Sequence, residues 1–341
     1  AVKKPNTKII KYILGYYEEI SRSQPFDYDQ VILQVVNDQD FQFSDHRVSD
    51  FVHFYQGLQD WKTSHVDWSN KHFSKISKGS FYNHKYLYHN ALALLEKGDV
   101  VGSLQQLKSL VSEDKLNQDL ADKAHWTIAR INFELNNFNE AVASYKLIRK
   151  PLVEHASLLL EKAWIAYNQD DLPKSMGYLY AFEAPSFKKY FTPEYFVLKS
   201  FIYKDACHFD SALSIADEFT QRYGKSLDAL YGRKKANDRE SQELLYVILS
   251  NESIKKLWEF IKLLEEERSR AEDLDGELVR NYLEQVYSLK IKQVSQTLKR
   301  LIDQEYKVRA NTLLKYEETT NLMQYEIGVD MYQVSSRSLV E

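Results

Sequence analysis

Glycine, proline and cysteine are all scarce in this chain. It has 341 residues, of which ten are glycine, six are proline and one, Cys207, is cysteine. So few turn-forming residues argue against an all-β sandwich or barrel, which needs a turn every few residues, and against collagen-like or low-complexity classes. A single cysteine excludes an internal disulfide and leaves the redox compartment undecided. The length predicts about two domains with a sizeable core.

No strong excess of charge and no long hydrophobic run is present. The 45 Lys and Arg residues and 49 Asp and Glu residues give a net charge of −4, so no overall field indicates nucleic acid or an anionic membrane as a partner. No stretch reaches 18 apolar residues, which predicts no membrane span. The chain begins at Ala1, which is typical either of a processed secreted protein or of a shortened chain, and both interpretations stay open.

The motifs of common active sites are missing as well. The two closest glycines, Gly98 and Gly102, are not followed by Lys-Ser/Thr, so a phosphate-binding loop is excluded. There is no Gly-x-Ser-x-Gly elbow, and the nine histidines never show the spacing of a His-Glu-x-x-His zinc helix. Cys207 and His208 are adjacent, but nothing indicates the cationic pocket that a reactive thiol needs. We therefore expect no catalytic residue, no metal site and no cofactor.

What the chain does have is aromatic side chains, with 24 Tyr, 17 Phe and 5 Trp, and an internal repeat. Five segments each combine an apolar pattern of helical period, a short polar turn and a second helical pattern. The turns fall at residues 64, 98, 136, 170 and 207, so the period is 34–38 residues. Small residues recur midway along each first helix and early in each second helix, where they let paired helices approach closely: Gly57, Ala91, Ala129, Ala163 and Ser200, then Ser69, Ser103, Ala141, Ser175 and Ala212.

The third copy carries a family resemblance. With Ala129, Asn136-Asn137-Phe138, Ala141 and Tyr145 it resembles the tetratricopeptide repeat (TPR) family, whose unit has 34 residues. The resemblance covers roughly residues 50–223 and implies an all-α fold, a TPR-like right-handed superhelix of about five helical hairpins. The apolar spacing of the segment that follows predicts a long helical or coiled-coil region after the superhelix. The chain also looks like repeat modules of envelope proteins from gliding and predatory proteobacteria, which implies the periplasm or cell envelope, with the cytoplasm as the alternative.

The segments around the repeats are also predicted to be helical. We expect an N-terminal helical extension at 1–45 with a helix over Tyr28–Val36, a repeat domain at 46–236, long helices or a coiled coil at 237–325 and a tail at 326–341. A polar linker is predicted at Lys225–Glu240, and a Ser-rich tail is predicted at Gln333–Glu341.

Two apolar seams of heptad spacing mark the C-terminal region. The stretch Asp273–Gly276 between them predicts a hairpin turn, with a continuous bent helix as the alternative. The second seam predicts self-association or docking of a coiled-coil partner. The first seam consists of Leu257, Ile261 and Leu264, and the second of Tyr287, Ile291, Val294, Leu298 and Leu301.

The first helices of stacked hairpins line a concave surface in the family that this chain resembles. Carried onto this sequence, the positions that face the groove are unusually aromatic, and an exposed apolar groove usually marks a binding site. Either the chain's own N- or C-terminal helices fill it, or a partner helix or peptide does. The expected partner-binding residues are Trp61, Tyr88, Lys123, Trp126, Arg130, Phe133, Trp164, Tyr167, Phe201 and Lys204, and the face also includes Phe54, Leu58, Lys85, Leu92, Leu95, Leu160 and Val197.

The hypothesis that follows is a non-catalytic scaffold for protein–protein interactions, expected in a bacterial cell-envelope complex. Trp126, Phe133, Trp164 and Tyr167 would anchor a partner helix while Lys123 and Arg130 orient an acidic group. One alternative is a module that binds cell-wall glycan, with peptidoglycan as a candidate partner, through the aromatic joint Tyr180–Pro193. Less favoured is a glycan-cleaving enzyme on a helical scaffold, with Glu134 or Glu161 as the catalytic carboxyl.

Overall fold

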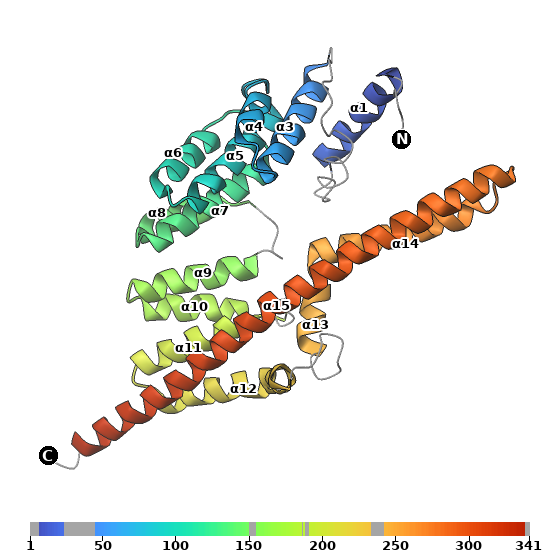
Figure 1. Cartoon of the computed structure of the whole chain (residues 1–341). Coiled ribbons are helices and arrows are strands. Elements are labelled where there is room, and N and C mark those ends of the chain that lie inside the picture. Colours follow the sequence, from blue (N-terminus) through green and yellow to red (C-terminus); the bar gives the residue numbers. More distant parts are fainter. Residues whose placement is uncertain are drawn as a thin grey trace. The chain divides into compact units, whose positions relative to one another are not determined.

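The protein is described by a computed structural model that covers residues 7–23, 45–149, 155–185, 187, 191–232 and 242–337 (Figure 1). All regular secondary structure within these residues is α-helical. The chain divides into two compact units, Ala1–His155 and Ala156–Glu341. This division falls inside the predicted repeat domain of 46–236, and the helix predicted at Tyr28–Val36 lies outside the described residues.

Among the described residues, the first unit contains one N-terminal helix and three helical hairpins. Each hairpin pairs a longer first helix with a shorter second one, and neighbouring hairpins contact each other through α3 and α5 and through α6 and α7. The helices are α1 (Thr7–Ser23), α3 (His46–Lys62), α4 (Val66–Phe73), α5 (Phe81–Glu96), α6 (Val100–Val111), α7 (Gln118–Glu134) and α8 (Phe138–Lys146).

The second unit contains two more hairpins and a C-terminal helical region. Its helices are α9 (His155–Asn168), α10 (Leu172–Phe182), α11 (Pro193–Asp205), α12 (Phe209–Tyr231), α13 (Gln242–Leu249), α14 (Glu252–Ala271) and α15 (Glu277–Arg337). The 61-residue α15 contacts α13 and α14 as well as α11 and α12. Figure 1 shows it running alongside α14 and then on toward α11 and α12.

The five predicted turn positions are confirmed by the backbone. Residues 64, 98, 136, 170 and 207 all have a positive φ, between 58° and 82°. At each turn two N–H groups donate back into the preceding helix: the amide of Asn136 bonds to the carbonyl of Phe133 at 2.9 Å, and that of Asn137 to the carbonyl of Asn132 at 2.8 Å. This pair of bonds defines the Schellman motif, which satisfies helix-end carbonyls. Cys207 therefore has a structural role as one of the five turn residues.

Close contact between paired helices explains the repeated small residues. Ala91, Ala129 and Ala163 are fully buried. The Ser69 hydroxyl donates to the carbonyl of Gly57 across the first hairpin at 2.9 Å, and the Ser175 hydroxyl donates to the carbonyl of Ala163 at 2.7 Å across the fourth. A larger side chain at these positions would separate the two helices. The recurring small residues thus mark where the two helices of a hairpin come into close contact, as predicted.

The C-terminal region differs from expectation in its boundaries. Gly276, with a φ of 103°, ends a turn between α14 and α15, so the hairpin alternative is correct and the continuous bent helix is wrong. The helix α12 continues to Tyr231, so the linker predicted from Lys225 was wrong over 225–231. The helix α15 continues to Arg337, through most of the segment that was predicted to be a tail.

The two predicted heptad seams pack against each other. Ile261 and Leu264 of α14 form one buried cluster with Val294 and Leu298 of α15. Val294 and Leu298 are each only 7% exposed, because α14 covers them. A coiled-coil partner on this seam would have to displace α14.

Candidate functional site

The ten expected partner-binding residues are divided between the two units. Trp61, Tyr88, Lys123, Trp126, Arg130 and Phe133 lie on α3, α5 and α7 of the first unit, and Trp164, Tyr167, Phe201 and Lys204 lie on α9 and α11 of the second. Lys123 and Arg130 are exposed and the other eight are half-buried. Each unit therefore carries its own part of the expected face.

Four of their neighbours on the predicted face belong instead to the core. Phe54, Leu58, Leu160 and Val197 are at most 9% exposed. Phe54 packs against the rings of Phe73 and Tyr82, and Leu160 belongs to the main cluster of the second unit. Contacts with neighbouring helices cover these four positions. The assignment of these four residues to the groove was wrong.

The helix α11 carries one side of the second unit's surface. We use the name α11 face for Glu194, Phe201 and Lys204, which lie 13, 6 and 3 residues before the turn at 207. The ammonium of Lys204 is 2.5 Å from Oε2 of Glu326 and 4.0 Å from Oδ2 of Asp330, both on α15. Phe201 packs against a cluster formed by Ala212 and Ala216 of α12 with Met323 and Ile327 of α15, all almost completely buried.

Glu194 links three helices at the other end of the same face. Its carboxylate accepts a hydrogen bond of 2.6 Å from Nε1 of Trp164 on α9. Tyr316 of α15 donates a second hydrogen bond to it. Burial raises the pKa of Glu194, and the hydrogen bonds from Trp164 and Tyr316 work in the opposite direction. Trp164 therefore holds a carboxylate that also binds α15.

Tyr167 also has a partner within the second unit. Its hydroxyl donates to Oδ2 of Asp205 at 2.6 Å, and its ring stacks on that of Phe201 at a centroid distance of 6.3 Å. Burial, together with the hydrogen bond to Asp205, raises the pKa of Tyr167. Tyr167 thus contacts α11. The α11 face is covered by the chain's own C-terminal helix, one of the two occupants expected from sequence.

The helix α7 of the first unit carries residues at the same distances from its turn, although their chemistry differs. We use the name α7 face for Lys123, Trp126, Arg130 and Phe133, which lie 13, 10, 6 and 3 residues before the turn at 136. The guanidinium of Arg130 lies over the Trp126 ring at 5.2 Å, and Phe133 contacts the ring of Phe138 at 5.8 Å between centroids. The structure brings these four residues together on one helix.

The neighbouring helix α5 extends this face. The hydroxyl groups of Tyr88 on α5 and Thr127 on α7 are hydrogen-bonded at 3.3 Å. The ammonium of Lys85 is 3.4 Å from the hydroxyl of Tyr55 and lies above the Phe54 ring at 5.2 Å. Trp61 on α3 packs edge-on against Phe73. Tyr88 thus joins the α7 face, whereas Trp61 packs beside the core of the first hairpin.

One partly buried polar cluster was missed by the sequence reasoning. The ammonium of Lys199 on α11 is 2.6 Å from Oε1 of Glu183 and 2.9 Å from the hydroxyl of Tyr195, and that hydroxyl also donates to Glu183. Burial lowers the pKa of Lys199 while its bonds to Glu183 and Tyr195 raise it, and the net shift is upward. The four-residue spacing of Tyr195 and Lys199 was the only signal in the sequence. The cluster joins α10 to α11 at the edge of the core of the second unit, where Lys199 is buried and Glu183 is exposed.

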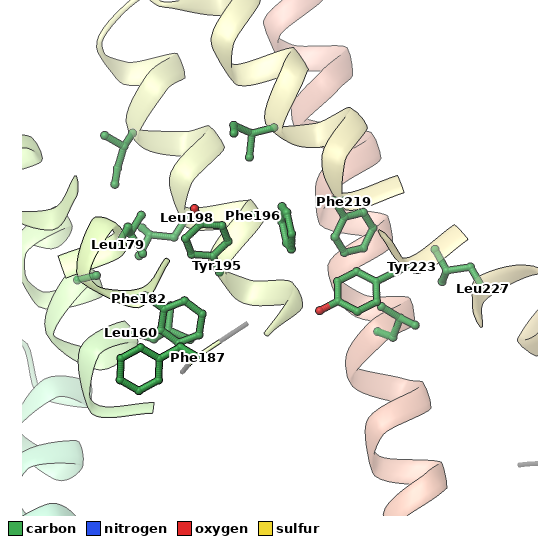
Figure 2. Packing of buried hydrophobic residues seen from close by; sticks show 14 of the residues in the cluster. Leu160, Leu179, Phe182, Phe187, Tyr195, Phe196, Leu198, Phe219, Tyr223 and Leu227 are labelled. Carbon is green, nitrogen blue, oxygen red and sulfur yellow. The ribbon is translucent and has the colours of Figure 1, made fainter. Parts of the chain in front are cut away.

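The aromatic joint Tyr180–Pro193 supplies core residues. Phe182 and Phe187 are 5–6% exposed and stack on each other at a centroid distance of 5.7 Å. Figure 2 shows these two rings together, near Leu160 and Leu179. Lys188, Lys189 and Tyr190 lie outside the described residues. The placement of Phe182 and Phe187 agrees with a packing role for the joint.

The described residues offer little to hold a metal. They contain no group of three or more His, Cys, Asp or Glu side chains arranged for an ion. Nδ1 of His53 and Nδ1 of His72 are 3.2 Å apart, and Asp60 is 3.6 Å from Nε2 of His72. Of the two carboxyls considered for catalysis, Glu134 is exposed at the end of α7 and Glu161 is half-buried on α9.

Comparison with known proteins adds no family. The sequence matches no protein-family model and no curated protein. Within the described residues, no helix combines the length and apolar character required to cross a bilayer.

Proposed function

We propose that this protein is a non-catalytic scaffold whose α7 face, together with Lys85 and Tyr88 of α5, binds an amphipathic helix with an acidic edge from a partner protein. The observation that supports the proposal most is in the second unit, where the equivalent α11 face packs against the amphipathic helix α15. Within the second unit, a helix of the chain itself is therefore already bound in the way that we propose for the partner helix. Helix-in-groove binding of this kind is common in protein recognition.

The equivalence between the two faces is positional. Counted back from their turns, Glu194 corresponds to Lys123, Phe201 to Arg130 and Lys204 to Phe133. The position of Trp126 corresponds to Val197, which is buried in the core of the second unit. All three members of the α11 face contact α15. Because paired helices repeat the same geometry, the corresponding α7 side chains point from the same side of their own hairpin.

The chemistry of the α7 face selects the partner. It combines two aromatic rings with the cations Lys123 and Arg130, and α5 adds Lys85 and Tyr88. An aliphatic or aromatic anchor placed on the rings would be stabilised by about 25 cal/mol for each Å² of apolar area removed from water. Carboxylates along the edge of a bound helix would pair with the cations, which favours correct orientation.

The segment of α15 that packs on the α11 face has this same character. Residues 310–332 contain Glu317, Glu318, Glu326 and Asp330 against the single cation Lys315, and their buried face includes Leu313, Met323 and Ile327. A peptide of this sequence is therefore a suitable model ligand for the α7 face.

The proposal extends to the architecture and location of the protein. We infer that the five hairpins are TPR-like repeats of a right-handed superhelix, supported by the 34–38-residue period and the five Schellman turns. A cell-envelope location stays a prediction, which cell fractionation tests.

A binding titration tests the proposed function. A fluorescein-labelled peptide of residues 310–332 is titrated with the full chain and followed by fluorescence anisotropy. We expect Lys123→Glu with Arg130→Glu to weaken binding at least tenfold, because two cations become two anions facing an acidic helix. Trp126→Ala should weaken binding to a similar degree through loss of an aromatic anchor.

A matched control separates a local effect from a general charge effect. Lys299→Glu with Arg300→Glu makes the same charge change on an exposed part of α15 and should leave the affinity unchanged. A benzoylphenylalanine photo-crosslinker at position 126 should attach to the peptide. Failure of the peptide to bind, or equal loss of affinity in both double variants, would contradict the proposal.

A further inference from the structure

An exposed row of apolar side chains follows the first turns of α15. Val279, Tyr282, Val286 and Leu289 are 50%, 67%, 42% and 58% exposed, and we call these four residues the outer row. Leu278 beside them is 87% exposed. Their spacing of three, four and three residues is the heptad spacing of a coiled-coil seam.

The outer row is distinct from the seam that α14 covers. Tyr287, Ile291 and Val294 pack on α14, and at 3.6 residues per turn they lie about a third of a turn around α15 from the outer row. The hairpin of α14 and α15 therefore has an apolar seam inside and a second one facing outward. Single exposed apolar residues are normal on a protein surface, but an aligned exposed row is typical of an interaction site.

Charges are segregated along the same hairpin. Residues 265–277, which form its tip, contain seven acidic residues and two arginines, a net charge of −5. Residues 287–300 of α15, farther from the tip, contain Lys290, Lys292, Lys299 and Arg300 and no acidic residue, a net charge of +4. A surface that is acidic at one end and basic at the other is complementary to itself when turned around.

We propose that two copies of this chain associate through their outer rows, side by side and antiparallel. In this register Val279 lies opposite Leu289 of the second copy and Tyr282 lies opposite Val286, which gives four apolar layers related by a two-fold axis near residue 284. The acidic tip of each copy then lies beside the basic stretch of the other. Along the helix axis, Lys290 and Lys292 lie level with residues 278 and 276 of the second copy, next to its acidic turn, and the symmetry makes this arrangement twice.

Orientation follows from the charges. A parallel arrangement of the same two rows would place one acidic tip on the other and one basic stretch on the other, which is destabilising. The interface is short, so the dissociation constant should be on the order of micromolar, and salt should weaken it because the Debye length at physiological ionic strength is only about 8 Å. The dimer does not depend on the proposed function of the α7 face, and it would bring two such faces into one assembly.

Analytical ultracentrifugation of the full chain tests the proposal without any ligand. We expect a reversible monomer–dimer equilibrium that shifts toward monomer when NaCl is raised from 0.05 to 0.5 M. The double variant Tyr282→Glu with Val286→Glu should dissociate at least tenfold more readily, because it places four carboxylates in the apolar layers of the dimer. The matched control, Leu322→Glu with Tyr325→Glu, alters equally exposed residues elsewhere on α15 and should dimerise like the unmodified chain.

A charge exchange identifies the antiparallel partner. Lys290→Glu with Lys292→Glu, and separately Asp273→Lys with Asp275→Lys, should each weaken the homodimer, and an equimolar mixture of the two variants should restore dimers. Circular dichroism and thermal unfolding of each variant check that the helices still form. A chain that stays monomeric at 0.5 mM, a dimer insensitive to the outer-row variant, or variants that do not recombine on mixing would each overturn the proposal.

Discussion

At the residue scale, the positions of the hairpin turns could be predicted from the sequence, although the residue type at the turn varies. Four of the five hairpin turns place Ser64, Asn136, Asp170 or Cys207, none of them a glycine, in the left-handed region. A search for glycine alone would have found only Gly98. The period of the repeat identified all five turns, because it reports the spacing of helices independently of which residue makes the turn.

Side-chain environments were harder to predict than turns. Phe54 and Val197 were assigned to a groove but are buried, and the contact of Lys199 with Glu183 was not foreseen. The repeat period fixes which face of a helix a residue occupies. It does not fix what covers that face, since this depends on helices far away in the sequence.

Gly57 allows a sharp test of the close helix contact in the first hairpin. A methyl group at this position would come within 2.6 Å of the Phe73 ring. We expect Gly57→Ala to lower the free energy of unfolding by about 1–3 kcal/mol, as is typical when a packed core is overfilled. Urea denaturation followed by circular dichroism measures the change.

Gly177 is the matched control for this substitution. It lies inside α10, and an added Cβ would meet nothing within 4 Å. Gly177→Ala should therefore stabilise the protein by about 0.5–1 kcal/mol, since alanine loses less backbone entropy in a helix. If both substitutions destabilise the protein, or if neither does, the contact with Phe73 is not the reason that position 57 requires glycine.

At the element scale, α15 shows the same limit of prediction. The heptad spacing of residues 287–301 was recognised, and these residues do pack as a seam. That α14 covers this seam was not predicted. An apolar period indicates that a helix face is buried, but it does not indicate which segment buries it. Residues from 326 onward were expected to be a tail, yet Ile327 in this segment is fully buried.

The packing of α15 on the repeats depends on its buried side chains. We expect Ile327→Asp to destabilise this contact by more than about 3 kcal/mol, because it buries an unpaired carboxylate. Hydrogen exchange should then speed up in α11, α12 and the last turns of α15. Tyr325→Asp, at a position two residues away that is 72% exposed, is the control and should change exchange little. Equal protection in the two variants would show that α15 does not need this contact.

At the scale of the whole molecule, stability should depend on pH through two histidines of the first unit. His84 is 2% exposed and its Nε2 makes no hydrogen bond among the described residues. Burial lowers the pKa of His84, opposed by the nearby charge of Glu113, and burial likewise lowers the pKa of His125. Below the ordinary histidine pKa of 6.5 the unfolded chain therefore binds protons that the folded chain does not. Acid then favours unfolding.

We expect these two histidines to lower the free energy of unfolding between pH 7.5 and pH 5.5, by at most about 1.4 kcal/mol per pH unit for each extra proton bound on unfolding. The raised pKa of Glu194 acts in the opposite direction. His84→Leu should reduce that fall, whereas His46→Gln, at an exposed position, should preserve it. Urea unfolding at both pH values provides the measurement. An unchanged pH dependence in His84→Leu would exclude His84 as a source.

The length of α15 has a mechanical consequence. Its 61 residues extend for about 90 Å, and one unbroken helix carries both the tip hairpin and the contacts of Glu326 and Ile327 with the repeats. Tension applied at the hairpin would thus reach those contacts along the helix axis, in shear, where they resist together instead of peeling apart one by one. A force applied at the α14–α15 turn would therefore be transmitted along α15 to the hairpin of α11 and α12.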